Sequence, residues 1–131
     1  MISSTMASGP SPGAVEALYA TGHWLYSSER FAHAQSVFRA MIHLAPGDER
    51  GWLALGACYE ALGDAAAALE LYALAAADTV APRCLLARAR ILRRHGLEAE
   101  ARAAVREASR IAEHQRDHEL RRLVATEAGQ S

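Results

Sequence analysis

The sequence lacks several features on which whole classes of protein depend. It contains no Lys and no Asn, and its 14 basic residues, all Arg, are offset by 15 acidic residues to give a net charge of -1 over 131 residues. A protein without a clear positive excess cannot hold nucleic acid or anionic lipid by its overall charge. We therefore expect no nucleic acid among its partners.

Long apolar runs, a charged leader and a cysteine framework are also missing. No stretch approaches the roughly 18 apolar residues of a membrane-spanning helix, and residues 1–12 hold no Arg ahead of an apolar run. These absences predict a cytoplasmic protein that does not insert into membranes. The only cysteines, Cys58 and Cys84, lie in apolar helical stretches, which predicts two buried thiols rather than a disulfide or a zinc site.

Helix-breaking and β-branched residues are scarce after residue 13. Pro occurs there only at Pro46 and Pro82, while Ala, Leu, Arg and Glu dominate. This composition predicts an all-α domain over residues 14–128. Residues 1–13 are instead rich in Ser, Gly and Pro, which cannot bury apolar area, and we expect a disordered N-terminal tail.

What is present is a repeat. Gly22 and Gly56 lie 34 residues apart, as do Phe38 and Tyr72, and this spacing resembles that of tetratricopeptide repeats. The resemblance predicts three helix-turn-helix repeats, at about 15–48, 49–81 and 82–114, in a right-handed superhelix with a capping helix at 115–127. The helices are expected at about 14–27 and 30–44, 48–62 and 65–78, and 82–95 and 98–111.

Small and polar residues explain how each helix pair closes. Gly56 lies on the inner face of its helix, where the missing side chain lets the second helix approach closely. Gly63 and Gly96 are expected in the left-handed conformation that ends a helix, and Asp48 and Asp64 are expected to cap the helices that follow them.

The first helices of such repeats line a concave groove that suits extended peptides. Tyr19 and Tyr26 lie two helical turns apart, opposite the core-facing leucines, and exposed aromatics at this spacing favour contact with an apolar or proline-rich segment. The residues predicted to line the groove are Tyr19, His23 and Tyr26 in the first repeat, Leu53, Ala57 and Glu60 in the second, and Leu86, Arg90 and Arg93 in the third.

Particular runs are similar to the class II chaperones of bacterial type III secretion. They are Leu18 to Phe38, the Leu-Gly-Ala-Cys run at 55–58, and the segments 71–75 and 81–83. The resemblance covers residues 15–128 and implies a cytoplasmic chaperone that holds a hydrophobic translocator protein before export, through a Pro-x-Leu-x-x-Pro-like client segment. It also implies that Tyr19, Tyr26 and Phe31 are the aromatic residues of the groove. More loosely, it implies that Leu53 lines the groove as well.

This sequence departs from the pattern of that family in two ways, and both bear on the partners expected for the protein. Members usually carry an amphipathic helix before the first repeat for homodimer contacts, whereas a polar tail precedes residue 14 here, which leaves open a homodimer or a small helical co-chaperone. The third repeat is rich in Arg: residues 83–131 hold 11 Arg and 7 acidic residues, against 3 and 8 in residues 1–82. A basic end could steer an acidic client segment, or it could be an ordinary solvated surface.

No pattern in the chain calls for catalysis, a cofactor or a metal. His114 and His118 are spaced for one face of a helix, but Gln115 replaces the Glu of a zinc-protease motif and no third ligand lies near. We expect a protein that is not an enzyme. Two alternatives stay open: a generic adaptor that clamps a partner's C-terminal carboxylate with Arg90 and Arg93, and a co-chaperone of a secretion needle subunit. An Arg-based nucleic-acid binder ranks last.

Overall fold

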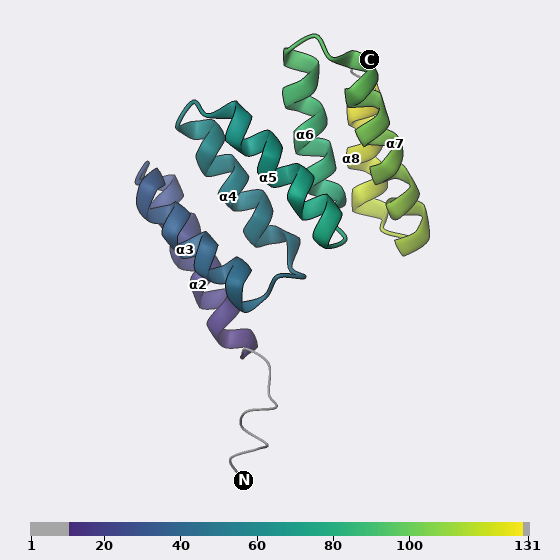
Figure 1. The fold of residues 1–131 in the computed structure, drawn as a ribbon. Helices are drawn as coiled ribbons and strands as arrows, with labels where there is room; N and C mark the ends of the chain where they lie inside the picture. The colour runs from purple at the N-terminus through teal and green to yellow at the C-terminus, as the bar shows by residue number, and fades with distance from the viewer. Residues whose placement is uncertain (1–10, 130–131) are drawn as a thin grey trace.

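Seven consecutive helices make up the part of the chain that the computed structural model describes, residues 11–129, and no strand occurs in that part (Figure 1). They are α2 (Pro12–Ser27), α3 (Phe31–Leu44), α4 (Glu49–Ala61), α5 (Ala65–Asp78), α6 (Pro82–Arg94), α7 (Glu98–Gln115) and α8 (His118–Ala128). The turns between them are short, so neighbouring helices pack as antiparallel hairpins.

The way the helices touch gives the molecule its curvature. Each helix packs on the next in the chain, and in addition α2 touches α4, α4 touches α6, and α6 touches α8. Within residues 11–129 no such contact joins α3 to α5 or α5 to α7. The first helices of the pairs are therefore crowded along the inner, concave side, while the second helices fan out on the convex side (Figure 1).

Glycine sets the distance between the helices of the first two pairs. A Cβ on Gly22 would overlap the ring of Phe38, and a Cβ on Gly56 would overlap the ring of Tyr72. Both rings are about 1% exposed. The predicted close approach at Gly56 is confirmed, and its partner is Tyr72, which fills the space that the missing side chain leaves.

The predicted turn residues are confirmed as well. Gly63 and Gly96 have φ of 80° and 77°, while Asp48 and Asp64 accept hydrogen bonds from the backbone N–H groups of Arg50 and Ala67. The equivalent turn of the first repeat has no glycine. Glu29 adopts a φ of 60° there, a conformation that costs a residue with a side chain about 1 kcal/mol.

The observed bounds of α2 and α7 differ from the prediction. Helix α2 begins at Pro12, because Ser11 caps it by accepting from the N–H of Ala14 and proline suits a first helical position. Residues 12 and 13 are thus not part of a disordered tail, and the rest of that prediction, residues 1–10, lies outside the described residues. Helix α7 runs past 111 to Gln115, since no breaker interrupts it before Arg116 turns left-handed.

Candidate peptide-binding site

A cavity of about 240 Å³ opens between α2 and α4 on the concave side of the superhelix. Its walls combine four rings and small aliphatic side chains with a single charged group. The lining residues are Tyr19, His23 and Tyr26 of α2, Phe38 of α3, and Arg50, Leu53, Ala54 and Ala57 of α4. We call this site the aromatic cavity. The structure therefore brings together five of the ten predicted groove residues.

The rings pack against one another in edge-on and tilted arrangements. The ring centroids of Tyr19 and His23 lie 5.9 Å apart at an interplanar angle of 61°, and those of Tyr19 and Phe38 lie 6.4 Å apart at 51°. Tyr26 packs edge-on against Phe31 at 5.2 Å. Contacts of this kind hold aromatic side chains in place without burying them fully. The cavity is thus preformed and offers an apolar surface to a ligand.

Arg50 forms the charged wall of the aromatic cavity and was missed as a site residue by the sequence argument. Its guanidinium carbon lies 4.7 Å from the centre of the Tyr19 ring. Its Nη2 donates to Glu16 at 2.6 Å and to Asp48 at 2.7 Å. These two carboxylates raise the pKa of Arg50, and the hydrogen bond from Arg50 lowers the pKa of Asp48. Arg50 is therefore a fixed cation that orients Tyr19.

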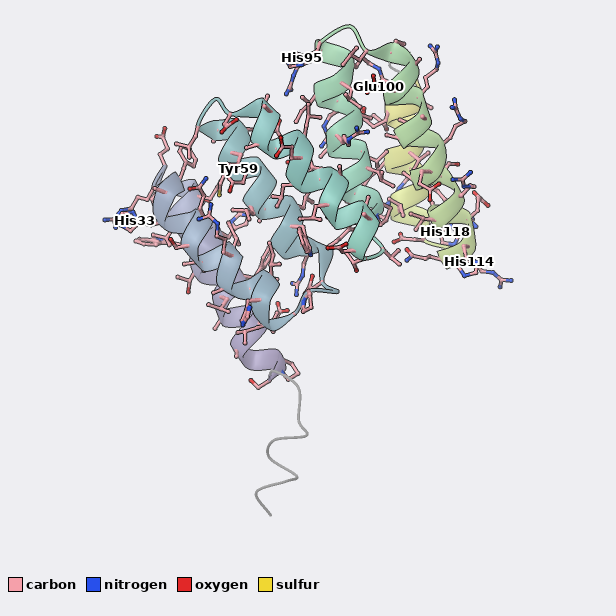
Figure 2. The ribbon with its side chains drawn as sticks, viewed as in Figure 1. His33, Tyr59, His95, Glu100, His114 and His118 are labelled. Atoms are coloured by element: carbon pink, nitrogen blue, oxygen red, sulfur yellow. The ribbon has the colours of Figure 1, made fainter. Side chains whose placement is uncertain are left out.

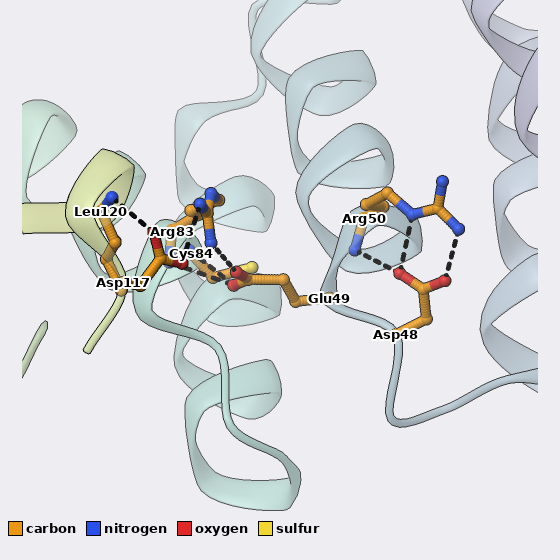
Figure 3. Close-up of polar contacts among 7 residues, drawn as sticks. All are labelled: Asp48, Glu49, Arg50, Arg83, Cys84, Asp117 and Leu120. Carbon is orange, nitrogen blue, oxygen red and sulfur yellow. Dashed lines mark hydrogen bonds and ion pairs between the residues drawn. The ribbon is translucent and has the colours of Figure 1, made fainter. Parts of the chain in front are cut away.

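The same kind of ion pair recurs one repeat later and fixes the register of the first helices (Figure 3). Arg50 pairs with Glu16, and Arg83 pairs with Glu49, each across 34 residues. Oε2 of Glu49 also accepts from the backbone N–H groups of Arg83 and Cys84, at 3.0 and 3.4 Å. Because α6 lacks a side-chain cap of its own, Glu49 caps it from the preceding repeat. Burial raises the pKa of Glu49.

The remaining predicted groove residues lie elsewhere. Phe31 supports Tyr26 from the start of α3 instead of lining the cavity. Glu60 accepts from the hydroxyl of Tyr72 at 2.7 Å and from Arg94 at 3.2 Å. The prediction that Leu86 lines the groove is wrong, because it is 2% exposed and belongs to the core that α6 forms with α7 and α8.

Arg90 and Arg93 line a second cavity on the concave side. It measures about 480 Å³ and is bounded by Arg90, Arg93 and Arg94 of α6 and by Glu127 of α8. Glu127 accepts from Nη1 of Arg90 at 2.8 Å and from Nη1 of Arg93 at 3.4 Å. We call this site the arginine cavity. The groove thus changes from aromatic to charged along its length.

The histidines do not gather into a site. His114 lies in the last turn of α7 and His118 begins α8, so the left-handed Arg116 separates two residues that were expected on one helix (Figure 2). His33 lies at the other end of the molecule. Over residues 11–129 no three His, Cys, Asp or Glu side chains are placed to hold a metal ion. Over the same residues, every helix is too short or too polar to cross a membrane.

Both cysteines are buried and free, as predicted for structural thiols. Burial raises the pKa of Cys58 to about 11 and that of Cys84 to about 12. Cys84 lies near the start of α6, where a helix dipole lowers a thiol pKa, but burial and the nearby carboxylate of Glu49 outweigh it.

Comparisons with known proteins agree with this architecture. A family model described as tetratricopeptide repeat matches residues 25–91. The structure is similar to the type III secretion translocator chaperone SycD of Yersinia enterocolitica, with a TM-score of 0.75, 30% identity and coverage of 88% of each chain. It is also similar to PcrH of Pseudomonas aeruginosa, with a TM-score of 0.74, 29% identity and coverage of 93% of this chain and 94% of that one. A search of curated protein sequences finds no match.

PcrH has also been solved with the chaperone-binding regions of PopB and PopD. The complex with the region from PopD has a TM-score of 0.73 and 30% identity, and covers 95% of this chain and 92% of that one. The complex with the region from PopB has a TM-score of 0.73 and 29% identity, and covers 91% and 98%. The chain belongs to the tetratricopeptide-repeat translocator chaperones of type III secretion, and the predicted all-α repeat fold is confirmed.

Proposed function

We propose that this protein is a cytoplasmic type III secretion chaperone that binds an extended, proline-containing segment of a hydrophobic translocator and keeps it soluble before export. The observation that carries the proposal is the aromatic cavity on the concave side. Its preformed apolar walls suit the aliphatic side chain of an extended segment. Related PcrH structures contain the chaperone-binding regions of PopB and PopD.

The proposed mechanism is binding alone and requires no catalytic group. Apolar client side chains would leave water in the aromatic cavity, where Tyr19, Tyr26 and Leu53 form the main contact surface. Arg50 would hold Tyr19 in position through the cation–π contact at 4.7 Å.

A titration of a labelled Pro-x-Leu-x-x-Pro peptide tests this proposal. We expect saturable binding to the wild-type protein. Ala57→Phe adds a ring inside the cavity without removing a core contact and should weaken binding at least about 30-fold, as should Tyr19→Ala combined with Tyr26→Ala. Leu74→Ala is the matched control, because Leu74 is an apolar residue of the convex helix α5, is 49% exposed and does not line the cavity.

Unchanged binding by Ala57→Phe would refute the site. Binding by the wild type only of peptides with a free C-terminal carboxylate, lost in Arg90→Ala, would instead favour the generic adaptor. The needle-subunit alternative predicts binding of a helical subunit in place of the extended peptide.

The proposal also includes a homodimer, or a complex with a small helical co-chaperone, as the unloaded state. Trp24 is an exposed aromatic of the kind that interfaces cover. Light scattering of the purified protein, whose chain mass is 14.1 kDa, measures the state directly. A dimer of the wild-type protein that Trp24→Ala weakens would support the homodimer, and a wild-type monomer over the whole concentration range would contradict it.

A further inference from the structure

The arginine cavity has no role in the apolar recognition described above, although it is the larger of the two concave cavities. We propose that it binds the carboxylates of an acidic stretch in the client, next to the apolar segment held in the aromatic cavity. This inference rests on the proposed function and adds a second, charged contact to it.

The cavity already holds a carboxylate. Glu127 is 7% exposed overall, and its two oxygens accept from Arg90 at 2.8 Å and from Arg93 at 3.4 Å. The main-chain oxygen of Glu127 accepts from Arg93 as well, at 3.2 Å. The spacing of the guanidinium groups on α6 is therefore suited to carboxylate oxygens, which they bind in a directional way.

The outer arginines are accessible to a further carboxylate. The side chains of Arg90 and Arg94 are 52% and 62% exposed. Arg90 donates to Glu127 through Nη1, and Arg94 donates to Glu60 through Nη2 at 3.2 Å. A guanidinium group carries five N–H donors, so one carboxylate oxygen does not saturate it. An acidic client residue can therefore bind beside these contacts without breaking them.

Charge distribution and spacing point to the same segment of the client. Residues 83–131, which contain the arginine cavity, hold 11 Arg and 7 acidic residues, whereas residues 1–82 hold 3 and 8. The aromatic cavity lies between α2 and α4 and the arginine cavity between α6 and α8. The two cavities are two interhelical spacings apart, at about 10 Å each. An extended peptide of about six residues spans this distance of about 20 Å.

An acidic peptide fits these surroundings better than a nucleic acid does. Three glutamates, Glu60, Glu98 and Glu127, pair with the three arginines of the cavity. A phosphate chain with one charge per nucleotide would meet these glutamates repeatedly, whereas isolated carboxylates can be placed between them.

Peptides with matched flanks test the inference. Each carries the Pro-x-Leu-x-x-Pro segment and, about six residues before or after it, either three Glu or three Gln. We expect the Glu peptide in one of the two placements to bind wild-type protein about tenfold more tightly than its Gln counterpart at low salt, and the gain to shrink as salt rises.

The gain should disappear in Arg90→Gln combined with Arg94→Gln, and shrink in Arg94→Gln alone, which leaves the contacts between α6 and α8 in place. Arg102→Gln combined with Arg110→Gln is the control, since these two arginines of α7 are 52% and 75% exposed and do not line the cavity. The control should keep the full gain.

Two outcomes would overturn the inference and leave the proposed function intact. One is equal binding of Glu and Gln peptides in both placements, and the other is a gain that survives in the Arg90 and Arg94 variants. Tighter binding of a short single-stranded oligonucleotide than of the Glu peptide would make the cavity a nucleic-acid site instead. If no peptide binds at all, the proposed function fails and the inference fails with it.

Discussion

Replacing Gly22 by Ala should damage both the stability of the protein and its client site. The new Cβ would overlap the ring of Phe38, which is 1% exposed and also lines the aromatic cavity. Overpacking a core of this kind costs about 1–3 kcal/mol, and replacing a helical glycine by alanine returns up to about 1 kcal/mol. The net loss is about 1–2 kcal/mol of unfolding free energy, or about 4–8 °C in Tm for a domain of this size.

Two matched substitutions separate the two effects. Gly56→Ala creates the same overlap in the second repeat, against Tyr72, which is not part of the aromatic cavity. Gly13→Ala places a Cβ where its nearest neighbour, Oγ of Ser11, is 3.7 Å away. Thermal unfolding should show a similar loss for Gly22→Ala and Gly56→Ala and none for Gly13→Ala.

Peptide titration well below Tm then isolates the site. Gly22→Ala should weaken binding, because Phe38 must shift in the wall of the cavity, whereas Gly56→Ala should bind normally. Phe38→Leu in the Gly22→Ala background should recover part of the lost stability. A Gly22→Ala protein as stable as Gly13→Ala would refute the packing argument, and equal binding by all three variants would refute the role of Phe38.

Other predictions concern single residues. Glu29→Gly should raise Tm by a few degrees, since glycine relieves the positive φ; an unchanged or lower Tm would contradict this. Burial raises the pKa of Glu49 in the folded protein above its value in the unfolded chain. The folded protein therefore loses stability as the pH rises from the unfolded pKa through the folded pKa and Glu49 ionises. The Tm of Glu49→Gln minus that of the wild type should therefore increase between about pH 4 and pH 7. A decrease would show that folding lowers the pKa of Glu49 instead of raising it. Cys58 and Cys84 should react with a thiol reagent only after unfolding; rapid native reaction would show that they are accessible.

Much of the fold could be predicted because it depends on local chemistry repeated at a fixed period. Glycines at 63 and 96 adopt positive φ, and an Asp caps the helix after each of two turns. Helical periodicity likewise placed Tyr19, His23 and Tyr26 on one face, and the structure brings these three together. Such features need only the residues within a turn or two of the chain.

Other features were decided by residues distant in sequence. Periodicity gives Leu86 the position that Leu53 has one repeat earlier, but α8 packs against α6 and buries it. The role of Arg50 depends on Glu16, 34 residues before it, which directs the guanidinium over Tyr19. Glu49 caps a helix of the next repeat in the same way.

Local chemistry along the chain is thus enough to specify the repeat, its turns and the face on which the aromatic side chains lie. The tertiary structure decided which part of that face stays open, because a side chain's exposure depends on the helix that stacks over it. Between α2 and α4 the stacking leaves an apolar cavity, whereas between α6 and α8 it buries Leu86 and leaves Arg90 and Arg94 at the surface.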